Sequence, residues 1–506
     1  MYVYYYIYIQ MKTRQTSKKQ KVQPSPRPKA PARPRLAAPF RRPLASPFSR
    51  DQLQAQFLRL LGPQDLAAWL PKRPRGYYQR LFSPLIILWY FVLARLQDGA
   101  TLQDVVQDAH WGGADALCPP GKPLSQRLKS WLTAGWCKAR QRLPLDLFYR
   151  ALNTQAQTVR GWVQNLTWKQ FHVFLLDGST IRLRPFGNIP TVFPPHPSRR
   201  PKRAYWCLMR VVVCLCAATG TVLGTALGAT SLSEQNLACS LILQALPHSL
   251  FVGDRNFGIF RIVQAVVQAR AQLLVRLTEV RARKLAAGPR LRPGLDRPVC
   301  WSPSPHDQVL PDTPAQPVAG RLIVVRVHPK GFRAQTLYLF TTLLDPQVYP
   351  VQELLKLYGV RWQIELHLRS LKSEMNLRVL ECKSADLARK EWIAGLLAYN
   401  LVRAVMVAAA VQAQRSVFDL SFRATQKLLL EYLDHTALGS HQPAQGWRIL
   451  MAGLIACRLP RRRKSRPPEP RAKRPFGEAV PTLYGSRAAA RKKLAALPPT
   501  KRHAKS

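Results

Sequence analysis

Acidic side chains are scarce in this chain. Its 506 residues hold 26 Asp and Glu against 77 Lys and Arg, which gives a formal net charge of +51. So large a charge of one sign is unlike that of an ordinary metabolic enzyme. It draws a protein toward polyanions, of which nucleic acid is the commonest. Hydrophobic residues still make up 47% of the chain, enough to bury a core, so a wholly disordered polyelectrolyte is excluded.

Metal-binding patterns of cysteine and histidine are missing as well. The nine cysteines are scattered singly without a CxxC pair, and the ten histidines form no cluster beside them. A structural zinc site is therefore not expected. An odd, unpatterned set of thiols suits a reducing cytosol better than a disulfide framework.

Long uncharged runs are also rare. Val211–Thr230 is long enough to cross a membrane, but its Val, Thr and Gly content and the turn signal at Ala218–Thr221 predict a buried β-hairpin. The first ten residues lack the small-residue cleavage site of a signal peptide. We expect no membrane segment and a cytoplasmic, nucleoid-associated protein.

The positive charge is concentrated at the ends without being confined to them. Residues 1–50 hold 12 basic and no acidic side chains, and residues 458–506 hold 16 basic and two acidic ones. About half of the net charge thus lies on the body between. The body itself is expected to meet a polyanion.

The hydrophobic pattern divides the chain into parts. Apolar residues first recur at three- and four-residue spacing, as in Leu53, Phe57, Leu60 and Leu61, which is typical of helices. After Phe171 short strand-like runs alternate with helical stretches, which predicts a mixed sheet with flanking helices. The expected parts are a disordered basic arm (1–50), a helical N-terminal domain (51–165), a sheet domain in two pieces (166–280 and 335–420) around a proline-rich, strand-bearing insertion (281–334), a C-terminal helical region (421–460) and a disordered basic tail (461–506).

Two aspartates follow short apolar runs that we predict to be strands. Asp177 comes after Phe174–Leu176, and Asp254 comes after Phe251–Gly253. A carboxylate at a strand end is held rigidly and projects into the open edge of the sheet, where α/β folds place ligand chemistry. Either aspartate alone is more often a turn former or a helix cap. Two of them in a chain so poor in acids favour a functional role.

The stretch from Val351 to about Met375 predicts one long amphipathic helix. Tyr358, Arg361, Glu365 and Lys372 stand at i, i+3, i+7 and i+14, which places them in a stripe about 60° wide on an ideal helix. A solvated face with an i, i+4 ion pair accounts for the Arg and the Glu only. It leaves the Tyr and the distant Lys unexplained.

A functional interpretation accounts for all four residues. Glu365 would join Asp177 and Asp254 in holding divalent metal, while the Tyr, Arg and Lys side chains would bind phosphate. Carboxylates without Cys or His partners suit Mg²⁺ or Mn²⁺. Two such ions about 3.5–4 Å apart can support an in-line attack on phosphorus.

These residues resemble a known family. Tyr358-x₂-Arg361-x₃-Glu365-x₆-Lys372 is similar to the C-terminal signature of DDE transposases from the insertion-sequence group with a Tyr-Arg-Glu-Lys motif (the insertion-sequence family four type). Asp177–Thr180 resembles the first-aspartate motif of that family, Gly253–Phe257 the second, and Ala398–Leu401 a run that follows the signature. Asn256 stands where many relatives have glycine, and a backbone that needs a positive φ tolerates Asn better than most residues.

The resemblance implies an RNase H-like catalytic domain that carries the metal-binding triad Asp177, Asp254 and Glu365, with two Mg²⁺ or Mn²⁺ ions. It also implies that Tyr358, Arg361 and Lys372 contact the DNA end, and that Trp362 stacks on distorted DNA. A core role is equally compatible with Trp362, and Trp301 is a weaker candidate for stacking. The partners would be double-stranded DNA, as element ends and target, and a second copy of the chain in a synaptic complex.

Three functions fit these patterns. The first is a transposase that cuts at the ends of an insertion sequence and joins them to target DNA by two-metal phosphoryl transfer. The second is a catalytically silent or domesticated DNA-binding protein that keeps the basic surface. The third is an RNase H-like nuclease without strand transfer. The helical stripe and the insertion favour the first.

Overall fold

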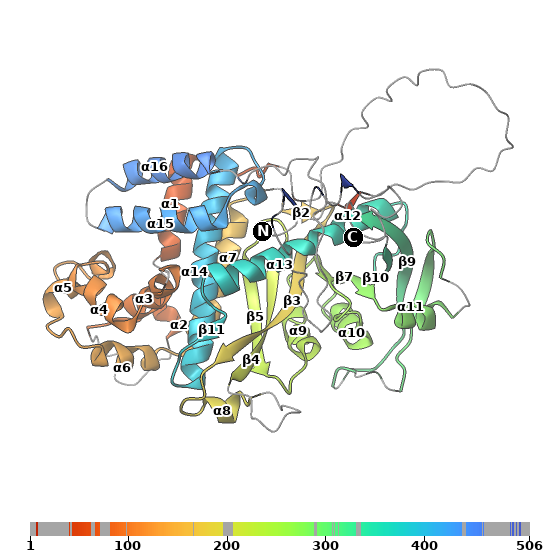
Figure 1. Ribbon diagram of the computed structural model, residues 1–506, viewed down its shortest axis with the longest axis horizontal. Coiled ribbons are helices and arrows are strands. Elements are labelled where there is room, and N and C mark those ends of the chain that lie inside the picture. The colour runs from red at the N-terminus through yellow and green to blue at the C-terminus, as the bar shows by residue number, and fades with distance from the viewer. Residues whose placement is uncertain are drawn as a thin grey trace, which may run out of the picture.

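The computed structural model describes the folded body of the chain and a few short pieces near its ends (Figure 1). The described residues are 7–8, 40, 43–61, 66–70, 81–97, 99–164, 166–195, 206–287, 291–305, 307, 309–311, 313–329, 335–437, 442–457, 459, 486, 488–489, 492 and 495–496. Most of the basic arm and tail expected from the sequence lie outside these residues.

A single mixed sheet forms one half of the body. Its strand order is β1–β9–β10–β7–β6–β3–β4–β5, with β2 and β11 paired to β3 and β8 paired to β9. The strands are β1 (Ile7–Tyr8), β2 (Thr167–Trp168), β3 (Phe171–Leu183), β4 (Cys207–Cys216), β5 (Val222–Ala229), β6 (Ser249–Gly253), β7 (Gln272–Leu277), β8 (Asp296–Trp301), β9 (Val318–Pro329), β10 (Gln335–Thr341) and β11 (Val379–Leu380).

The centre of the sheet is parallel and its flanks are antiparallel. β6 pairs in parallel with both β3 and β7, whereas β4 and β5 form the hairpin predicted for Val211–Thr230. On the other flank β10 pairs with β7 and β9 pairs with β10, both antiparallel. The strands of the proline-rich segment 281–334, β8 and β9, therefore continue the same sheet.

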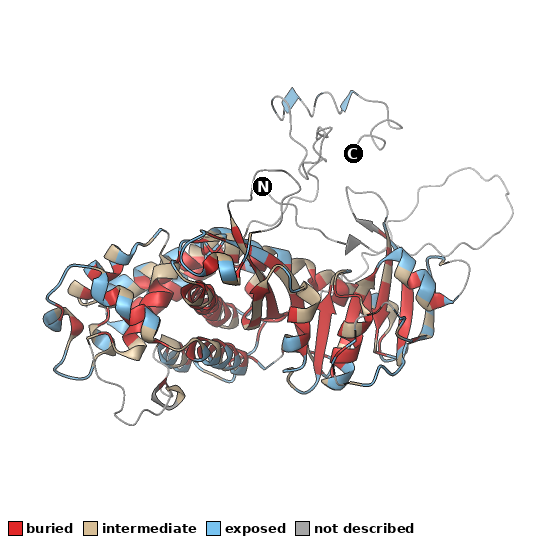
Figure 2. Cartoon of the chain, turned by 90° about the horizontal axis from the view of Figure 1, so that it is seen from below, coloured by how far each residue is buried: buried red, intermediate tan, exposed pale blue. Residues whose placement is uncertain are grey.

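Apolar side chains on both faces of β3 bury the sheet from two sides. Val173 and Leu175 belong to one hydrophobic cluster, while Phe174 and Leu176 belong to another. Successive side chains of a strand point to opposite faces, so this alternation requires a layer of helices on each face. The central strands β4 and β6 are accordingly buried over most of their length (Figure 2).

Short helices cover one face and long ones the other. α9 (Glu234–Ile242) packs on β4 and β5, α10 (Phe260–Gln268) on β7 and β9, and α11 (Glu279–Ala286) on β8 and β9. On the opposite face α7 (Leu145–Gly161) and α14 (Ala385–Gln412) pack on β5. α14 stands between the sheet and the helical half of the body (Figure 1).

The helical half surrounds α14. The helices that make most of the contacts with α14 are α1, α3, α7, α15 and α16. The helices outside the sheet domain are α1 (Arg50–Leu61), α2 (Leu66–Trp69), α3 (Pro84–Leu96), α4 (Leu102–His110), η1 (Asp115–Leu117), α5 (Leu124–Arg127), α6 (Ala134–Arg142), α15 (Phe422–Ala437) and α16 (Pro443–Ala456), and short turns lie at α8 (Ile189–Val192) and η3 (Val417–Asp419).

α14 is the one helix among the described residues that is long and apolar enough to cross a membrane. Its 28 residues have a mean hydropathy of 1.8 in the most apolar window, and all of that window is buried by other parts of the protein. A central core helix has the same length and composition, because it is covered on all sides. The packing around α14 explains its apolar character without a membrane.

Two expectations about the site elements are wrong in detail. Asp177 lies in the middle of β3 instead of following it, because the strand continues for six residues beyond Asp177 along β4. The expected continuous helix from Val351 to Met375 is divided into α12 (Val351–Val360), α13 (Trp362–Arg369) and a π-helical turn, η2 (Ser370–Glu374). A π-helical turn widens the helix, so the ideal spacing does not hold beyond α13.

Candidate active site

The register of the two central strands brings Asp177 and Asp254 side by side. The last registered pair of β3 and β6 is Leu175 with Val252, and each aspartate stands two residues beyond its member of that pair. Paired strands lie about 4.8 Å apart. Because the two strands run in the same direction here, Asp177 and Asp254 lie at the same level, where β6 ends beside β3.

The surroundings of Asp177 disfavour its negative charge. The pKa of Asp177 is raised from an ordinary 3.8 to about 6; burial is the largest cause, and the negative charges of Asp254 and Glu234 act in the same direction. A hydrogen bond from the backbone N–H of Gly178 (2.8 Å) and the positive charge of Arg361 act in the opposite direction. Burial and the neighbouring carboxylates thus outweigh the groups that favour the ionised form of Asp177.

Tyr358 and Arg361 lie against this pair of aspartates. Tyr358 is buried, which raises the pKa of its hydroxyl, and its electrostatic neighbours are Arg361, Arg276 and Asp254. Arg361 joins α12 to α13, and its guanidinium carbon lies 6.0 Å from the centre of the Tyr358 ring. Both side chains therefore face the carboxylates from the predicted stripe.

Lys372 approaches from the π-helical turn. Burial lowers the pKa of its amine, and the negative charges of Asp177 and Glu234 oppose that shift. Lys372 lies in η2, and its amine lies near enough to Asp177 and Glu234 to interact with their charges. The four-residue stripe expected from the sequence is thus broken as a helix, although Tyr358, Arg361 and Lys372 still converge.

Glu365 has a different neighbour. Its carboxylate accepts a hydrogen bond from Nη2 of Arg361 at 3.2 Å, and about half of its side-chain surface is exposed. Among the described residues, no three Asp, Glu, His or Cys side chains are grouped closely enough to hold a metal ion. Oxygen donors at Asp177 and Asp254 fit a hard divalent cation, whereas Glu365 is not grouped with them.

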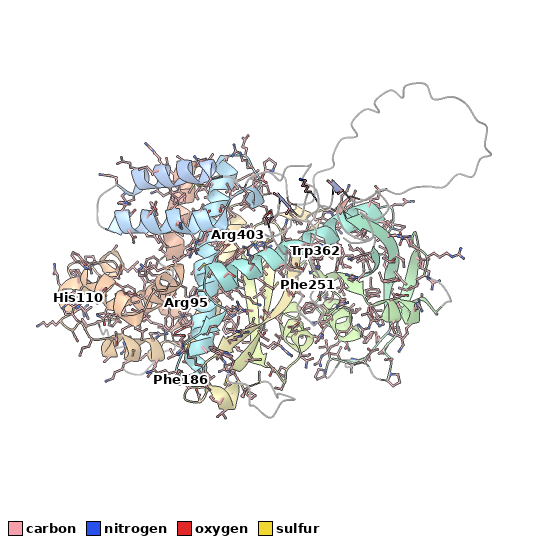
Figure 3. The ribbon with its side chains drawn as sticks, in the orientation of Figure 1. Arg95, His110, Phe186, Phe251, Trp362 and Arg403 are labelled. Carbon is pink, nitrogen blue, oxygen red and sulfur yellow. The ribbon has the colours of Figure 1, made fainter. Side chains whose placement is uncertain are left out.

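The two tryptophan candidates differ in exposure. Trp362 is half-buried at the start of α13, and the guanidinium of Arg361 lies over its ring at 4.4 Å (Figure 3). Trp301 is buried in the core, where its ring packs edge-on against Phe340 at 4.9 Å. Trp301 is too deeply buried to stack on DNA, whereas Trp362 is partly exposed.

The run Ala398–Leu401 fastens α14 to the β4–β5 turn. The carboxamide of Asn400 accepts from the N–H of Val222 (2.8 Å) and donates to its carbonyl (2.9 Å). The hydroxyl of Tyr399 donates to the carbonyl of Gly220 and lies 2.8 Å from Nδ1 of His367 on α13. These bonds hold α13 and the hairpin in one relative position, so the run supports the site from behind.

Glu234 is a site neighbour that no motif indicated. It lies in the first turn of α9, and its carboxylate group occupies the space in which a side chain at Gly178 would stand. The sequence shows only a Ser-Glu pair at a helix start, which is the ordinary pattern of a helix cap. The contact with Gly178 arises from packing between α9 and the sheet, and it is not visible in the sequence.

Comparisons with known proteins show which family the chain resembles. Residues 168–401 match the family described as transposase DDE domain. Transposase InsG for insertion sequence element IS4 of Escherichia coli (strain K12) is 26% identical to the chain over 286 residues, which is 54% of this chain and 61% of that relative. The chain thus spans about three fifths of the length of this curated relative.

A solved structure is also similar at low identity. The cryo-EM structure of the piggyBac transposase synaptic complex with hairpin DNA has a TM-score of 0.40 and 9% sequence identity, and the match covers 79% of this chain and 85% of that chain. With a TM-score of 0.40, this likeness supports no conclusion about the function of the chain.

Proposed function

Through residues 168–401 the chain belongs to the DDE transposases of the insertion sequence IS4 type, and we propose that it cuts DNA at the ends of such an element and joins them to target DNA. The observation that carries the proposal is the meeting of Asp177 and Asp254 with Tyr358, Arg361 and Lys372 where β6 ends beside β3. Carboxylates surrounded by cationic and hydroxyl groups suit phosphoryl transfer.

The central part of the sheet supports an RNase H-like arrangement of the catalytic domain. Strands β5, β4, β3, β6 and β7 lie in this order, with the parallel strands carrying Asp177 and Asp254 at the middle. α9 and α10 connect them on one face. In this arrangement Asp177 lies in β3 and Asp254 directly follows β6, so both carboxylates are attached to central strands, which keeps them positioned during the reaction.

Asp177 and Asp254 are the residues proposed to hold Mg²⁺ or Mn²⁺, with Glu365 as the third ligand of the triad. Two bound ions would activate the attacking oxygen and stabilise the leaving oxygen on phosphorus. The chain's own contribution is a buried carboxyl group at Asp177 whose raised pKa would fall again beside a cation, so that a bound ion would favour its ionised form. Glu365 would take its place through a side-chain rotation away from Arg361, which the half-exposed position of its carboxylate allows.

Arg361, Lys372 and Tyr358 are proposed to bind the DNA end. The Nε–H of Arg361 is buried and has no hydrogen-bond acceptor among the described residues. A phosphate oxygen would satisfy that donor. Lys372 would neutralise a second phosphate, and Trp362 would stack on a base displaced from the duplex.

The remaining parts of the proposal follow from charge and from the need to pair two ends. The helices of residues 51–165 would bind the element end, and two copies of the chain would assemble in the synaptic complex. The basic arm (1–50) and tail (461–506) would add electrostatic attraction to DNA. Such a protein would work in the cytoplasm, at the nucleoid.

The test uses the DNA that flanks the gene. A duplex carrying the terminal inverted repeat, labelled at either strand, is incubated with the purified protein and Mg²⁺ or Mn²⁺. We expect a nick that leaves a 3′-hydroxyl at the element end and, with plasmid added, joined products. Nicking without joining would favour the nuclease. Retention of the duplex without any cut would favour the silent DNA-binding protein.

A further inference from the structure

Glu234 lies at the proposed active site, although none of the motifs contains it. A Cβ atom placed on Gly178 would stand 2.3 Å from Cδ of Glu234, so the carboxylate packs directly on the backbone that follows Asp177. The charge of Glu234 acts on both Asp177 and Lys372. Its side chain is half-buried there. The negative charges of Glu234 and Asp177 repel each other, so specific partners are needed to hold the Glu234 carboxylate there.

Asn256 is one such partner. Its Nδ2 donates to Oε2 of Glu234 at 2.6 Å, and its Oδ1 accepts from Nε2 of Gln235 at 2.6 Å. A carboxylate can only accept, so this pair of contacts settles the orientation of the amide. Asn256 is not among the described residues with positive φ, so the reason expected for Asn at this position is wrong. Its side chain, not its backbone, distinguishes it from glycine.

The same residue holds Asp254. The backbone N–H of Asn256 donates to Oδ1 of Asp254 at 2.8 Å, and the carbonyl of Asn256 accepts from Nε2 of Gln235 at 3.0 Å. A chain of hydrogen bonds thus runs from Glu234 through Asn256 to the second aspartate. It connects the start of α9 with the turn between β6 and α10.

An acidic residue in the first turn of a helix is favourable through the helix dipole alone. That effect requires no contact with Asn256 or with Gly178. Asp146 in the first turn of α7 illustrates the simple case, because its exposed carboxylate pairs with Arg150 of the same helix. Glu234 instead directs its carboxylate across to another element, which the dipole does not explain.

We propose that Glu234 and Asn256 form a clamp that orients the Asp254 carboxylate for divalent metal, with Glu234 as a positioning residue of the transposition reaction. The inference rests on the proposed function for its place in that reaction. The hydrogen bond between the two side chains is the part that matters, and the charge of Glu234 is secondary. Gln at position 234 keeps an acceptor for Nδ2 of Asn256, whereas Ala does not.

The experiment measures Mn²⁺ binding by calorimetry and end cleavage as a function of Mn²⁺ concentration on the full chain. Glu234→Ala and Asn256→Ala are each expected to weaken Mn²⁺ binding and raise the Mn²⁺ concentration for half-maximal cleavage about 10-fold. The double variant is expected to equal either single one, because both remove the same contact. Glu234→Gln should stay within about 3-fold of the wild type.

Exchanging the donor at position 256 with the acceptor at position 234 gives a second test. Recovery of Mn²⁺ binding in the exchanged pair cannot result from a general loss of folding. Asn256→Asp alone places two carboxylates against each other and should weaken Mn²⁺ binding. Combined with Glu234→Gln it restores one donor facing one acceptor, and binding should recover. Gly178→Ala, which pushes the Glu234 side chain aside, should resemble Glu234→Ala. Glu279→Ala is the matched control and should behave as the wild type.

The outcomes separate the clamp from the proposed function. Unchanged Mn²⁺ binding in Glu234→Ala and Asn256→Ala overturns the clamp, as does Glu234→Gln being as weak as Glu234→Ala. Failure of the wild type to bind Mn²⁺ overturns the clamp and the metal-dependent function together. If the wild type binds Mn²⁺ with the expected pattern of variants but cuts no DNA end, the clamp stands and the proposed function fails.

Discussion

Arg361 donates a hydrogen bond from Nη2 to Oε1 of Glu365 at 3.2 Å, so the carboxylate expected in the metal triad is paired with a cation from its own stripe. The guanidinium is buried and the carboxylate is about half exposed. An i, i+4 pair of this kind contributes little to stability. It can therefore be exchanged for metal and phosphate at small cost when DNA binds.

Glu365→Gln tests this exchange. We expect the variant to bind the labelled DNA end about as well as the wild type and to cut it at least about 100-fold more slowly, because a neutral amide is a poor ligand for a hard cation. Gel retardation and a cleavage time course on the same duplex measure the two properties. Glu353→Gln on α12 is the control and should retain cleavage. Full activity in Glu365→Gln would remove Glu365 from the triad.

Asp177→Asn tests how much the buried, ionised carboxylate of Asp177 destabilises the folded protein. Because the folded state raises the pKa of Asp177 to about 6, the carboxylate opposes folding increasingly as the pH rises from about 4 through 6. Asn removes this effect, so in metal-free buffer at pH 8 the variant should be more stable by about 2 kcal/mol. Urea unfolding at pH 4 and pH 8 measures the change.

The gain in Asp177→Asn should shrink at pH 4, where the wild-type carboxyl is protonated and costs little. It should also shrink when Mg²⁺ is added at pH 8, since the ion stabilises only the wild type. Asp146→Asn, an exposed member of an ion pair with Arg150, is the control and should change the free energy of unfolding by about 0.5 kcal/mol or less. A destabilised Asp177→Asn at pH 8 contradicts the prediction.

Glu391 joins α14 to the helical half of the body through ion pairs with Arg95 of α3 and Arg140 of α6. Burial raises the pKa of Glu391, but the two guanidinium groups outweigh it, and the net pKa lies below the usual 4.5. Glu391→Gln leaves Arg140 buried without its counter-charge. We expect a loss of about 3 kcal/mol in the free energy of unfolding at pH 7.

The pH dependence of the Glu391 contribution follows from its lowered pKa. The contribution is complete above the unfolded value near 4.5 and is lost as the pH falls through the lower folded value. The gap between wild type and Glu391→Gln should therefore be constant from pH 6 to 8 and narrow below pH 4.5. Glu279→Gln is the exposed control. A gap that widens in acid would mean that the pairs do not stabilise the charged form.

Gly220 occupies the β4–β5 turn at φ +72°, where a Cβ would lie 2.5 Å from Nη2 of Arg403 and 2.7 Å from Cε1 of His367. Gly220→Ala combines backbone strain with displacement of both side chains. We expect a loss of about 3 kcal/mol. Gly99→Ala, at φ +76° with open space around it, isolates the backbone part and should lose only about 1 kcal/mol. Equal losses would show that the packing behind the site is not tight.

Lys372→Ala tests the phosphate contact. The logarithm of DNA affinity should fall with the logarithm of salt concentration, by about 0.9 per phosphate neutralised. Removing one contact should lower that slope by about one. Lys284→Ala, an exposed cation on α11, is the control. Fluorescence anisotropy measures the slopes at salt concentrations from about 50 to about 300 mM, the range in which DNA affinity changes strongly. An unchanged slope for Lys372→Ala would place its amine away from the DNA.

Much of the fold was predictable because its signals are local. The strand β7 at Gln272–Leu277, the β4–β5 hairpin and the long helix α14 follow from runs of apolar residues and turn signals that need no distant partner. The end of β3 was not predictable. Asp177 and Gly178 interrupt an apolar run and read as a turn, but pairing with β4 continues the strand through them.

By itself, the sequence determined the chemistry of this protein: a large positive charge, two aspartates after apolar runs, and a spaced Tyr-Arg-Glu-Lys set. Only the tertiary structure decided how these groups meet. The parallel register of β3 with β6 places Asp177 beside Asp254, Lys372 lies near Asp177 in the π-helical turn, and packing of α9 adds Glu234. These relations depend on contacts between segments far apart in the chain, which residue spacing does not encode.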